Sequence, residues 1–424
     1  MRILVVGSGG REHALAWKIS QSPLVREVYC APGNPGIARV AQLVPVRADA
    51  VEDVVREARA LRIDLVVVGP EAPLVLGLAD RLAREGILAF GPTAAAAEIE
   101  GSKAFAKDVM LAAGIPTAEH GTFEELEPAL AFARARGGRV VVKADGLAAG
   151  KGVVVAGGPG EAEAALRDML VGRIHGRAGA KVVVEERLEG PEASVIALAD
   201  GERVRLLPAA QDHKRVGDGD RGPNTGGMGA FSPTPHVTPE VAREVEERVL
   251  LPALRELARR GRPFRGALYA GLMLTPRGLR VLEFNARLGD PETQPLMMRV
   301  AGDIVPALLA AARGDLSQVR LEIDPRAAIG VVLAAEGYPA KPVAGDAIEG
   351  AGGPFAGDVQ VFHAGTALGA DGRVIASGGR VLTVCALGAD LAAARGRAYA
   401  ALGRIRLRGG HYRSDIGLAA RQGG

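Results

Sequence analysis

The chain has 424 residues, of which 48% are hydrophobic and 24% are charged, with 58 glycines and 26 prolines. This profile predicts a globular, loop-rich protein of about two to four domains. The net charge of +3 and the lack of a long block of Lys and Arg argue against nucleic-acid binding. No apolar run approaches the roughly 20 residues that a membrane span needs.

The two cysteines and the N-terminus indicate the cellular compartment. Cys30 and Cys385 lie far apart, match no metal or redox spacing, and each ends a Val-rich run, so we expect buried structural thiols. The chain starts with a strand that runs into a turn and shows no signal-peptide plan. We therefore expect a cytoplasmic protein.

Residues 1–102 alternate short apolar strands with helical stretches, which is the pattern of an open parallel α/β sheet. Ligands of such sheets bind beyond the carboxyl ends of the strands, where we expect the loops 7–13, 31–36 and 69–73. The expected strands are residues 3–6, 25–30, 64–68 and 87–90, and the expected helices are residues 11–20, 51–61 and 74–85.

The glycine-rich loop 7–13 invites comparison with dinucleotide-binding loops. The third glycine of G-x-G-x-x-G would fall on Glu12, and the next strand ends without a ribose-binding acid, so we reject that interpretation. Two interpretations remain. The amides of Gly9 and Gly10 bind a phosphate at a helix start, assisted by Arg11 and His13, or the loop is a tight turn without a ligand.

Two further regions follow in the sequence. Residues 103–325 include a compact α+β unit at 121–190, and residues 326–424 are rich in strands and turns. In the α+β unit we expect a helix at 125–136 and strands at 140–143, 152–156 and 181–185. Beyond residue 326 we expect strands at 329–334, 360–364, 373–376 and 380–386, and a helix at 391–403.

A lysine-flanked glycine loop joins two strands at residues 143–152. It is not a Walker A loop, because a strand follows it where that motif requires a helix. We expect a mobile hairpin loop that folds over a triphosphate, with Lys143 held on the preceding strand. The alternative is an ordinary surface hairpin.

Two other segments have the composition of ligand-binding loops. Residues 182–192 form a strand leading into a hinge, where backbone groups can read an adenine and Glu192 can bind ribose hydroxyls. Residues 211–229 are mostly glycine and charged side chains, a poor core and a typical binding loop. The EF-hand spacing is absent there. His213, taken alone, we expect on the surface.

The strand with Glu283 and Asn285 predicts a metal site. Side chains alternate across a strand, so both residues point to the same face and offer hard oxygen ligands for Mg²⁺ carrying nucleotide phosphates. Arg287 continues that face if the strand extends so far, and its guanidinium suits a transferring phosphoryl group. The alternative is an edge strand with a polar, solvated face.

Taken together, these segments resemble the glycinamide ribonucleotide synthetases of the ATP-grasp superfamily nearly end to end. The resemblance is carried by residues 9–14, 101–103, 143–152, 211–229, 282–287 and 289–293. It implies an ATP-grasp fold of mixed α/β and α+β class. The implied parts are an N-terminal open parallel α/β domain (1–102), an ATP-grasp domain (103–325) with a small mobile lid (121–190), and a β-rich C-terminal domain (326–424).

The resemblance also implies roles for individual residues. The implied ligands of Mg²⁺, or of Mn²⁺ in its place, are Glu283 and Asn285. The preceding strand, 267–273, lacks the acidic metal ligand that many members of the superfamily carry there. Waters and ATP oxygens would then complete the metal shell. The implied catalytic residues are Lys143, Asp212, Lys214 and Arg287. The implied ATP site comprises Lys103, Lys143, Gly146, Gly150, Lys151, Gly152, Glu185, Glu186, Leu188 and Glu192. The implied substrate site comprises Gly9, Gly10, Arg11, Glu12, His13, Asn34, Glu71, Asp212, Lys214, Arg287, Asp290 and Glu292.

The implied reaction joins glycine to 5-phosphoribosylamine with cleavage of ATP to ADP and phosphate, through glycyl phosphate, in purine biosynthesis. All expected partners are these small molecules, and the expected assembly is a monomer or a weak homodimer. Two alternative functions are a carboxylating ATP-grasp enzyme of purine synthesis and a nucleotide sensor without catalysis. Intact Lys143, Glu283, Asn285 and Arg287 argue against the sensor.

Overall fold

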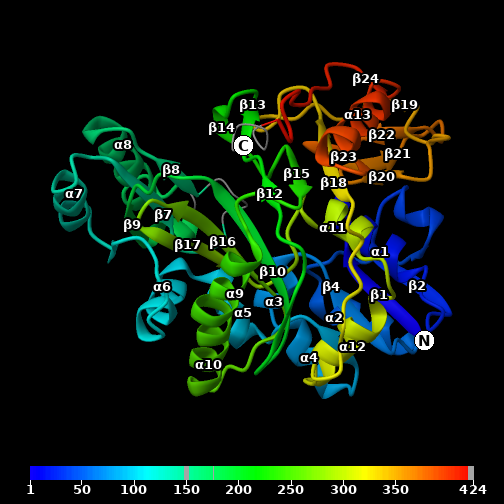
Figure 1. Cartoon of the computed structure of the whole chain (residues 1–424), viewed down its shortest axis with the longest axis horizontal. Helices are drawn as coiled ribbons and strands as arrows, with labels where there is room; N and C mark the ends of the chain where they lie inside the picture. Colours follow the sequence, from blue (N-terminus) through cyan, green and yellow to red (C-terminus); the bar gives the residue numbers. More distant parts are fainter. Residues whose placement is uncertain (148–151, 175, 419–424) are drawn as a thin grey trace.

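The computed structural model describes residues 1–147, 152–174 and 176–418. Figure 1 shows the N-terminal sheet and the C-terminal strands stacked on one side, and a unit that carries α7 and α8 projecting on the other. The mixed α/β and α+β class expected from the sequence is confirmed by a parallel N-terminal sheet and antiparallel sheets in the rest of the described chain. No helix within the described residues is both long and apolar enough to cross a membrane.

The N-terminal part is a five-stranded parallel sheet with the strand order β3-β2-β1-β4-β5. The expected helix at 74–85 is wrong as one element, because Gly77 adopts a φ of +84° and separates two short helices. The strands are β1 (Arg2–Gly7), β2 (Glu27–Pro32), β3 (Gln42–Leu43), β4 (Leu65–Val68) and β5 (Leu88–Phe90), and the helices are α1 (Gly10–Ile19), α2 (Val51–Ala60), α3 (Glu71–Val75), α4 (Leu78–Arg84) and α5 (Ala94–Gly101).

The projecting unit follows α6 (Lys103–Ala112) and is an antiparallel sheet with the order β6-β9-β7-β8 and two helices (Figure 1). It has a hydrophobic cluster of its own, which includes Leu130, Val140, Leu166 and Val184. A unit with a separate core can be displaced without exposing the core of the rest of the molecule. Its elements are β6 (His120–Phe123), α7 (Leu126–Arg134), β7 (Val140–Ala144), β8 (Val153–Val155), α8 (Pro159–Leu170) and β9 (Val182–Glu186).

The central sheet has the order β11-β10-β16-β17, so β17 is an edge strand. In the register of β16 and β17, Glu283 lies opposite Gly271 and Asn285 lies opposite Tyr269. Apolar side chains on the other face pack with α9 and α10 into the largest core cluster. The elements are β10 (Glu192–Asp200), β11 (Val204–Leu206), α9 (Pro239–Val245), α10 (Leu251–Arg259), β16 (Arg265–Thr275), β17 (Gly278–Asn285), α11 (Thr293–Arg299) and α12 (Val305–Arg313).

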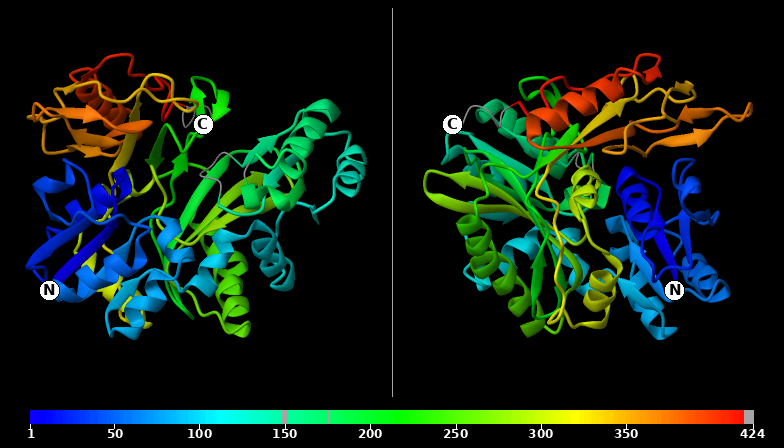
Figure 2. Two further views of the ribbon diagram at one scale, coloured as in Figure 1. Left: turned by 180° about the vertical axis from the view of Figure 1, so that it is seen from behind. Right: turned by 45° about the vertical axis from the view of Figure 1, so that its right-hand side comes forward.

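The C-terminal sheet has the order β12-β15-β18-β23-β20 and takes in two strands from far upstream. β12 and β15 bound the loop 213–228, so this loop is attached to the C-terminal sheet at both ends. Figure 2 shows these strands above the N-terminal sheet. The elements are β12 (Gln211–Asp212), β13 (Arg215–Gly217), β14 (Arg221–Asn224), β15 (Gly229–Ser232), β18 (Ala327–Ala334), β19 (Ile348–Glu349), β20 (Val359–His363), β21 (Thr366–Leu368), β22 (Val374–Ala376), β23 (Arg380–Gly388), α13 (Leu391–Leu402) and β24 (Arg406–Leu407).

Candidate active site

A cavity of about 780 Å³ lies where the N-terminal loops, the projecting unit, the central sheet and the C-terminal sheet meet. Its walls carry both cations and carboxylates, the composition that suits a phosphorylated, charged substrate. Most residues proposed from the sequence line it: Arg11, Glu71, Lys103, Lys143, Gly146, Gly152, Glu185, Glu186, Leu188, Glu192, Asp212, Lys214, Glu283, Asn285, Arg287, Asp290 and Glu292. Gly150 and Lys151 lie outside the described residues.

Five expected substrate residues are not among those that line the cavity: Gly9, Gly10, Glu12, His13 and Asn34. In this structure the Gly9 amide donates to the Glu12 carboxylate at 2.5 Å, so a phosphate would have to displace that carboxylate, and the binding of a phosphate by the Gly9 and Gly10 amides stays a prediction. A Cβ on Gly10 would lie 2.5 Å from the side-chain nitrogen of Gln294, so this glycine provides close packing of α1 on α11.

His13 and Asn34 hold the N-terminal loops against β20. The His363 amide donates to Nδ1 of His13 at 2.7 Å, and Nδ2 of Asn34 donates to the His363 carbonyl at 2.9 Å. Burial, the neighbouring His363 and Arg39 lower the pKa of His13 to about 3, so its ring is neutral near pH 7. A neutral, hydrogen-bonded ring adds no charge for a phosphate.

Three lysines mark one end of the cavity. Nζ of Lys103, at the start of α6, donates to the Gly146 carbonyl at 2.9 Å. Lys143 on β7 and Lys107 on α6 form ion pairs with the same oxygen of Glu185, at 2.9 and 3.0 Å. Glu185 is only 1% exposed, so its carboxylate is shielded from water and its charge is balanced by these two lysines. On the other face of β9, Glu186 accepts from Arg277 at 2.9 Å.

A second charged cluster surrounds Lys214, on the segment that follows β12. Nζ of Lys214 donates to the Glu192 carboxylate at 2.6 Å, so the carboxylate proposed for ribose already has a cation. Burial raises the pKa of Asp212 to about 7, with Glu292 and Glu192 adding to the rise and Lys214 opposing it. Asp212 therefore changes its protonation state near neutral pH.

A buried hydroxyl network lies beside that cluster. The Ser194 and Tyr269 hydroxyls are 2.9 Å apart, and both donate to one oxygen of Glu292, at 3.2 and 3.1 Å. Glu292 is buried, and these bonds fix its orientation. Tyr269 was not proposed from the sequence.

Glu283 and Asn285 provide the oxygens suited to a metal ion. Burial alone would raise the pKa of Glu283, but Lys214, Lys143 and Lys103 lower it below its usual value, so the carboxylate is ionised. Oδ1 of Asn285 accepts from Arg287 at 3.2 Å. Within the described ranges, no three His, Cys, Asp or Glu side chains are grouped as a metal site.

β17 ends at Asn285, so Arg287 lies beyond it and the condition under which it would continue the face of that strand is not met. Its guanidinium forms ion pairs with Glu100 at 3.0 Å and Glu71 at 3.3 Å. These partners come from α5 and α3, and they join the N-terminal part to the central sheet. Glu100 was not identified from the sequence.

His213 is buried at 5% exposure, so the expected surface position is wrong. Its ring packs 6.0 Å from that of Phe231, and the Gly417 amide donates to its Nε2 at 3.4 Å. Burial and the nearby Arg413 lower the pKa of His213 to about 4. The glycines and charged residues around it in the sequence concealed this contact with the C-terminal segment.

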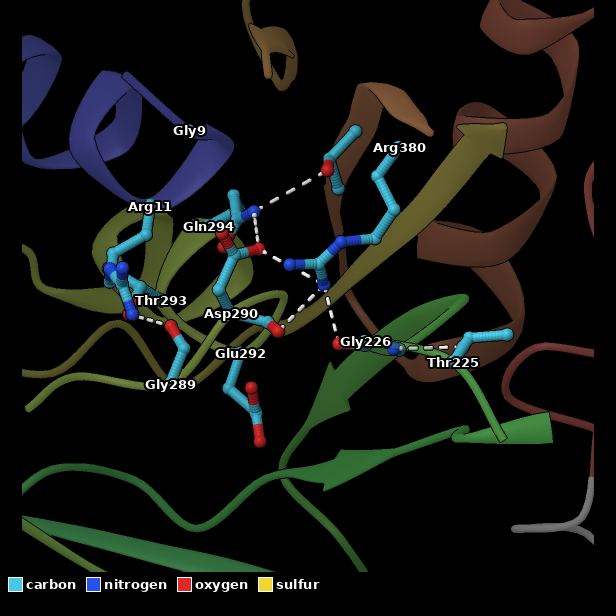
Figure 3. A network of polar contacts seen from close by, with 12 residues as sticks. Gly9, Arg11, Thr225, Gly226, Gly289, Asp290, Glu292, Thr293, Gln294 and Arg380 are labelled. Atoms are coloured by element: carbon cyan, nitrogen blue, oxygen red, sulfur yellow. Dashed lines mark hydrogen bonds and ion pairs between the residues drawn. The ribbon is translucent and has the colours of Figure 1, made fainter. Parts of the chain in front are cut away.

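Arg380 reaches the cavity from the C-terminal sheet and was also missed (Figure 3). Its Nη1 donates to the carbonyls of Gly226 and Asp290 at 2.6 and 2.8 Å, and lies 3.4 Å from the Asp290 carboxylate. Gln294 donates to the same carboxylate at 2.9 Å. In the sequence Arg380 merely starts a Val-rich strand, with no motif around it.

Three family models cover nearly the whole chain. They are the N domain of phosphoribosylglycinamide synthetase at residues 1–100, its ATP-grasp (A) domain at 101–293 and its C domain at 328–419. Among curated proteins, the phosphoribosylamine–glycine ligase of Caulobacter vibrioides is 54% identical over 423 residues, covering 100% of this chain and 99% of that protein. The same ligase of Salmonella typhimurium is 52% identical and covers 99% of each.

Solved structures give the same result. A crystal structure of phosphoribosylamine–glycine ligase from Thermotoga maritima matches with a TM-score of 0.85 and 33% identity, covering 98% of this chain and 100% of that one. The biotin carboxylase domain of 2-oxoglutarate carboxylase from Hydrogenobacter thermophilus, solved with MgADP, ADP and bicarbonate, matches with a TM-score of 0.75. That match is 19% identical, covers 97% of this chain and 91% of that one, and supports the fold alone.

Proposed function

This chain belongs to the phosphoribosylglycinamide synthetase family, and we infer that it catalyses the ATP-dependent joining of glycine and 5-phosphoribosylamine to glycinamide ribonucleotide, a step of purine biosynthesis. The observation that carries this conclusion is the full-length similarity to phosphoribosylamine–glycine ligases, at 54% identity over 423 residues. The cavity supports this conclusion, because the N-terminal loops, the projecting unit, the central sheet and the C-terminal sheet all contribute cations or carboxylates to its walls.

We propose that glycine is activated first. A carboxylate oxygen of glycine attacks the γ-phosphorus of ATP, the bond from that phosphorus to the ADP oxygen breaks, and glycyl phosphate and ADP form. Negative charge on the phosphoryl oxygens requires cations in a site that excludes water. Lys103 and Lys143 are suited to the phosphates of ATP, and Arg287 to the phosphoryl group in transfer.

The residues at the end of β17 fit the Mg²⁺ that accompanies ATP. Glu283 is an ionised carboxylate and Asn285 an amide oxygen, and such hard oxygen donors are what Mg²⁺ prefers. When bound, the ion would neutralise phosphate charge. Gly271, opposite Glu283, brings no third protein ligand, so we propose that waters and phosphate oxygens complete the shell, and Mn²⁺ is the alternative ion.

In the second step, the amine nitrogen of phosphoribosylamine attacks the carbonyl carbon of glycyl phosphate and the bond to the phosphate oxygen breaks. The attacking nitrogen loses a proton. We propose that Asp212 accepts it, because the pKa of Asp212, raised by burial to about 7, suits a group that is deprotonated before the step and protonated after it. Lys214 holds the neighbouring Glu192 and stabilises the ionised form of Asp212.

The lid, proposed as residues 121–190, takes in most of the projecting unit and covers these steps. Glycyl phosphate is a mixed anhydride, and water that reached it would release glycine and waste the ATP. We also propose that the hinge residues Glu186 and Leu188 contact the adenine of ATP. For the whole chain we propose a monomer or weak homodimer, which light scattering at several concentrations tests.

The order of bond formation is tested with glycine labelled with ¹⁸O in its carboxylate. Through glycyl phosphate, one labelled oxygen moves to the inorganic phosphate in each turnover, as mass spectrometry would detect. Omitting each substrate in turn tests the overall reaction, since ADP release should require both glycine and phosphoribosylamine. Unlabelled phosphate, or ADP release driven by bicarbonate in place of glycine, would contradict the proposal.

A further inference from the structure

A buried carboxylate with two cations lies at the proposed nucleotide end of the cavity. Glu185, Lys107 and Lys143 are 1%, 2% and 6% exposed, and both lysine nitrogens lie within 3.0 Å of Oε1 of Glu185. The two ammonium groups carry two positive charges and the carboxylate carries one negative charge, so the cluster has a net charge of +1. One of the two lysines is therefore available for another anion.

The directed hydrogen bonds of the two lysines go to different neighbours. Nζ of Lys107 donates to the hydroxyl of Thr117 at 2.6 Å, and that hydroxyl donates to the Val281 carbonyl at 2.6 Å. Nζ of Lys143 donates to the Leu282 carbonyl at 2.9 Å. Both ammonium groups lie within 3.0 Å of Oε1 of Glu185, and the positive charge of the two lysines keeps this buried carboxylate ionised.

The two lysines also belong to different parts of the molecule. Lys143 lies on β7, next to β9 with Glu185 in the projecting sheet, whereas Lys107 lies on α6 outside that sheet. Nζ of Lys143 donates to the carbonyl of Leu282, the neighbour of the proposed metal ligand Glu283, whereas Nζ of Lys107 donates to the hydroxyl of Thr117. Lys143 is therefore the lysine placed to engage a nucleotide, and Lys107 is the one placed to remain.

Electrostatics sets the condition under which Lys143 can turn to a phosphate. Burial would raise the pKa of Glu185, but Lys143 and Lys107 bring it below its usual value. Removing every cation from a buried carboxylate is strongly destabilising, because the charge is left without a partner in a medium of low dielectric constant. With Lys107 in place, Glu185 keeps a counter-charge when the contact with Lys143 weakens.

We propose that Lys107 is a positioning residue that neutralises Glu185 and thereby frees the charge of Lys143 for the nucleotide phosphates. The proposal rests on the phosphate role of Lys143 given above. Without Lys107, Lys143 becomes the sole counter-ion of a buried carboxylate and is held away from the nucleotide. Without both Lys107 and the charge of Glu185, Lys143 is free again.

Calorimetric titration of the full-length protein with MgADP tests this. Lys107→Met should weaken MgADP binding by about tenfold, which corresponds to about 1.4 kcal/mol. Lys107→Arg, which keeps the charge, should bind much as the wild type does. The double variant Lys107→Met with Glu185→Gln should bind MgADP nearly as tightly as Glu185→Gln alone does. If Lys107→Met acted only through a lost packing contact, the second substitution would not restore the affinity.

Unchanged affinity in Lys107→Met, or a double variant that binds as weakly as Lys107→Met does, would overturn the proposal. If Lys107→Met does not fold, the double variant decides, because Glu185→Gln removes the buried carboxylate that Lys107→Met leaves with a single cation: it should fold and bind MgADP much as Glu185→Gln does. Lys143→Met separates the two proposals. If it binds MgADP as tightly as the wild type, the phosphate role of Lys143 is wrong, whatever the Lys107 variants show.

Discussion

The ammonium group of Lys214 lies 2.6 Å from a carboxylate oxygen of Glu192, and this pair joins the segment after β12 to the first residue of β10. Asp212 lies two residues before Lys214 and feels both partners of the pair, since Lys214 lowers its pKa and Glu192 raises it. Together with burial, which is the largest cause of the raised pKa, and with Glu292, the pair influences the pH at which Asp212 gives up its proton.

Glu192→Gln should shift the pH dependence of catalysis. It removes a carboxylate that raises the pKa of Asp212 and leaves Lys214 without that partner, and both changes lower this pKa from about 7. If Asp212 must be ionised to accept a proton, the acidic limb of kcat/KM moves to lower pH. The profile of Glu189→Gln, an exposed carboxylate in the same hinge, should match the wild type. An acidic limb that stays in place in Glu192→Gln would exclude Asp212 as the acceptor.

Glu283→Gln should lower ATP turnover by orders of magnitude, because it keeps the shape of the side chain and removes the anionic metal ligand. The thermal unfolding midpoint should stay near that of the wild type. Glu349→Gln, at an exposed position in β19, is the matched control. Near wild-type turnover of Glu283→Gln at limiting Mg²⁺ would show that the metal is bound elsewhere.

Arg380→Met should reduce kcat/KM for phosphoribosylamine by about tenfold, the usual scale for removing charged hydrogen bonds that position a site. The change removes the donor shared by Gly226 and Asp290, whereas the lysines at the other end of the cavity are untouched. KM for ATP should therefore change little. Arg373→Met, which loses only an exposed pair with Asp371, is the comparison. Equal losses for both substrates would point to a general loss of structure.

The stability of the protein should fall as the pH drops from about 6.5 to about 4.5, before most carboxylates titrate. Burial lowers the pKa of His13 to about 3 and of His213 and His363 to about 4. Between these pH values the three imidazoles bind protons in the unfolded chain but remain neutral in the folded protein, so the free energy of unfolding declines as the pH falls. Each such histidine contributes about 1.4 kcal/mol per pH unit. Urea unfolding of His213→Gln should show a shallower dependence, and an unchanged slope would contradict a neutral His213.

Gly10→Ala should destabilise the protein by about 1–3 kcal/mol, because the new Cβ would lie 2.5 Å from Nε2 of the fully buried Gln294. Gly396→Ala is the opposite case, in an exposed position of α13 where a Cβ meets nothing within 4 Å. It should stabilise the helix by about 0.5–1 kcal/mol. Calorimetric unfolding compares the two, and equal effects would contradict the close packing of α1 on α11.

Four of the five strands of the N-terminal sheet were predictable, because each is an apolar run separated from the next by a helical stretch, whereas β3 is a pair of exposed residues and was missed. Gly77 marked the break in the expected helix, but only its backbone conformation shows that one helix ends there and another begins. Glu283 and Asn285 were also within reach, since the period of a strand places them on one face. Arg287 falls outside that strand because the end of a strand depends on its neighbour, and β16 pairs no further than Asn285.

The residues that sequence reasoning missed act through partners far away in the chain. In the sequence Lys107 is an ordinary helix lysine, and only its contact with Glu185 in the fold marks it as a residue of the site. The role of Arg380 is likewise visible only from its hydrogen bonds to Gly226 and Asp290. His213 was misjudged for the same reason, since Gly417 and Phe231 supply its surroundings. Such contacts are fixed by tertiary packing, which local patterns do not encode.

The attachment of the loop 213–228 to the C-terminal sheet sets an order of events during synthesis. β15 pairs with β18, which the ribosome makes only after the whole central sheet and α12 have been made. Until then one edge of β15 has no neighbour, and Arg380 is not yet available to hold Gly226. The proposed nucleotide end of the cavity can thus form first, while the end around Asp290 is assembled only when the chain is almost complete. A ribosome-bound chain that stops before β18 would then have the proposed place for ATP and no finished form of the proposed place for the acceptor amine.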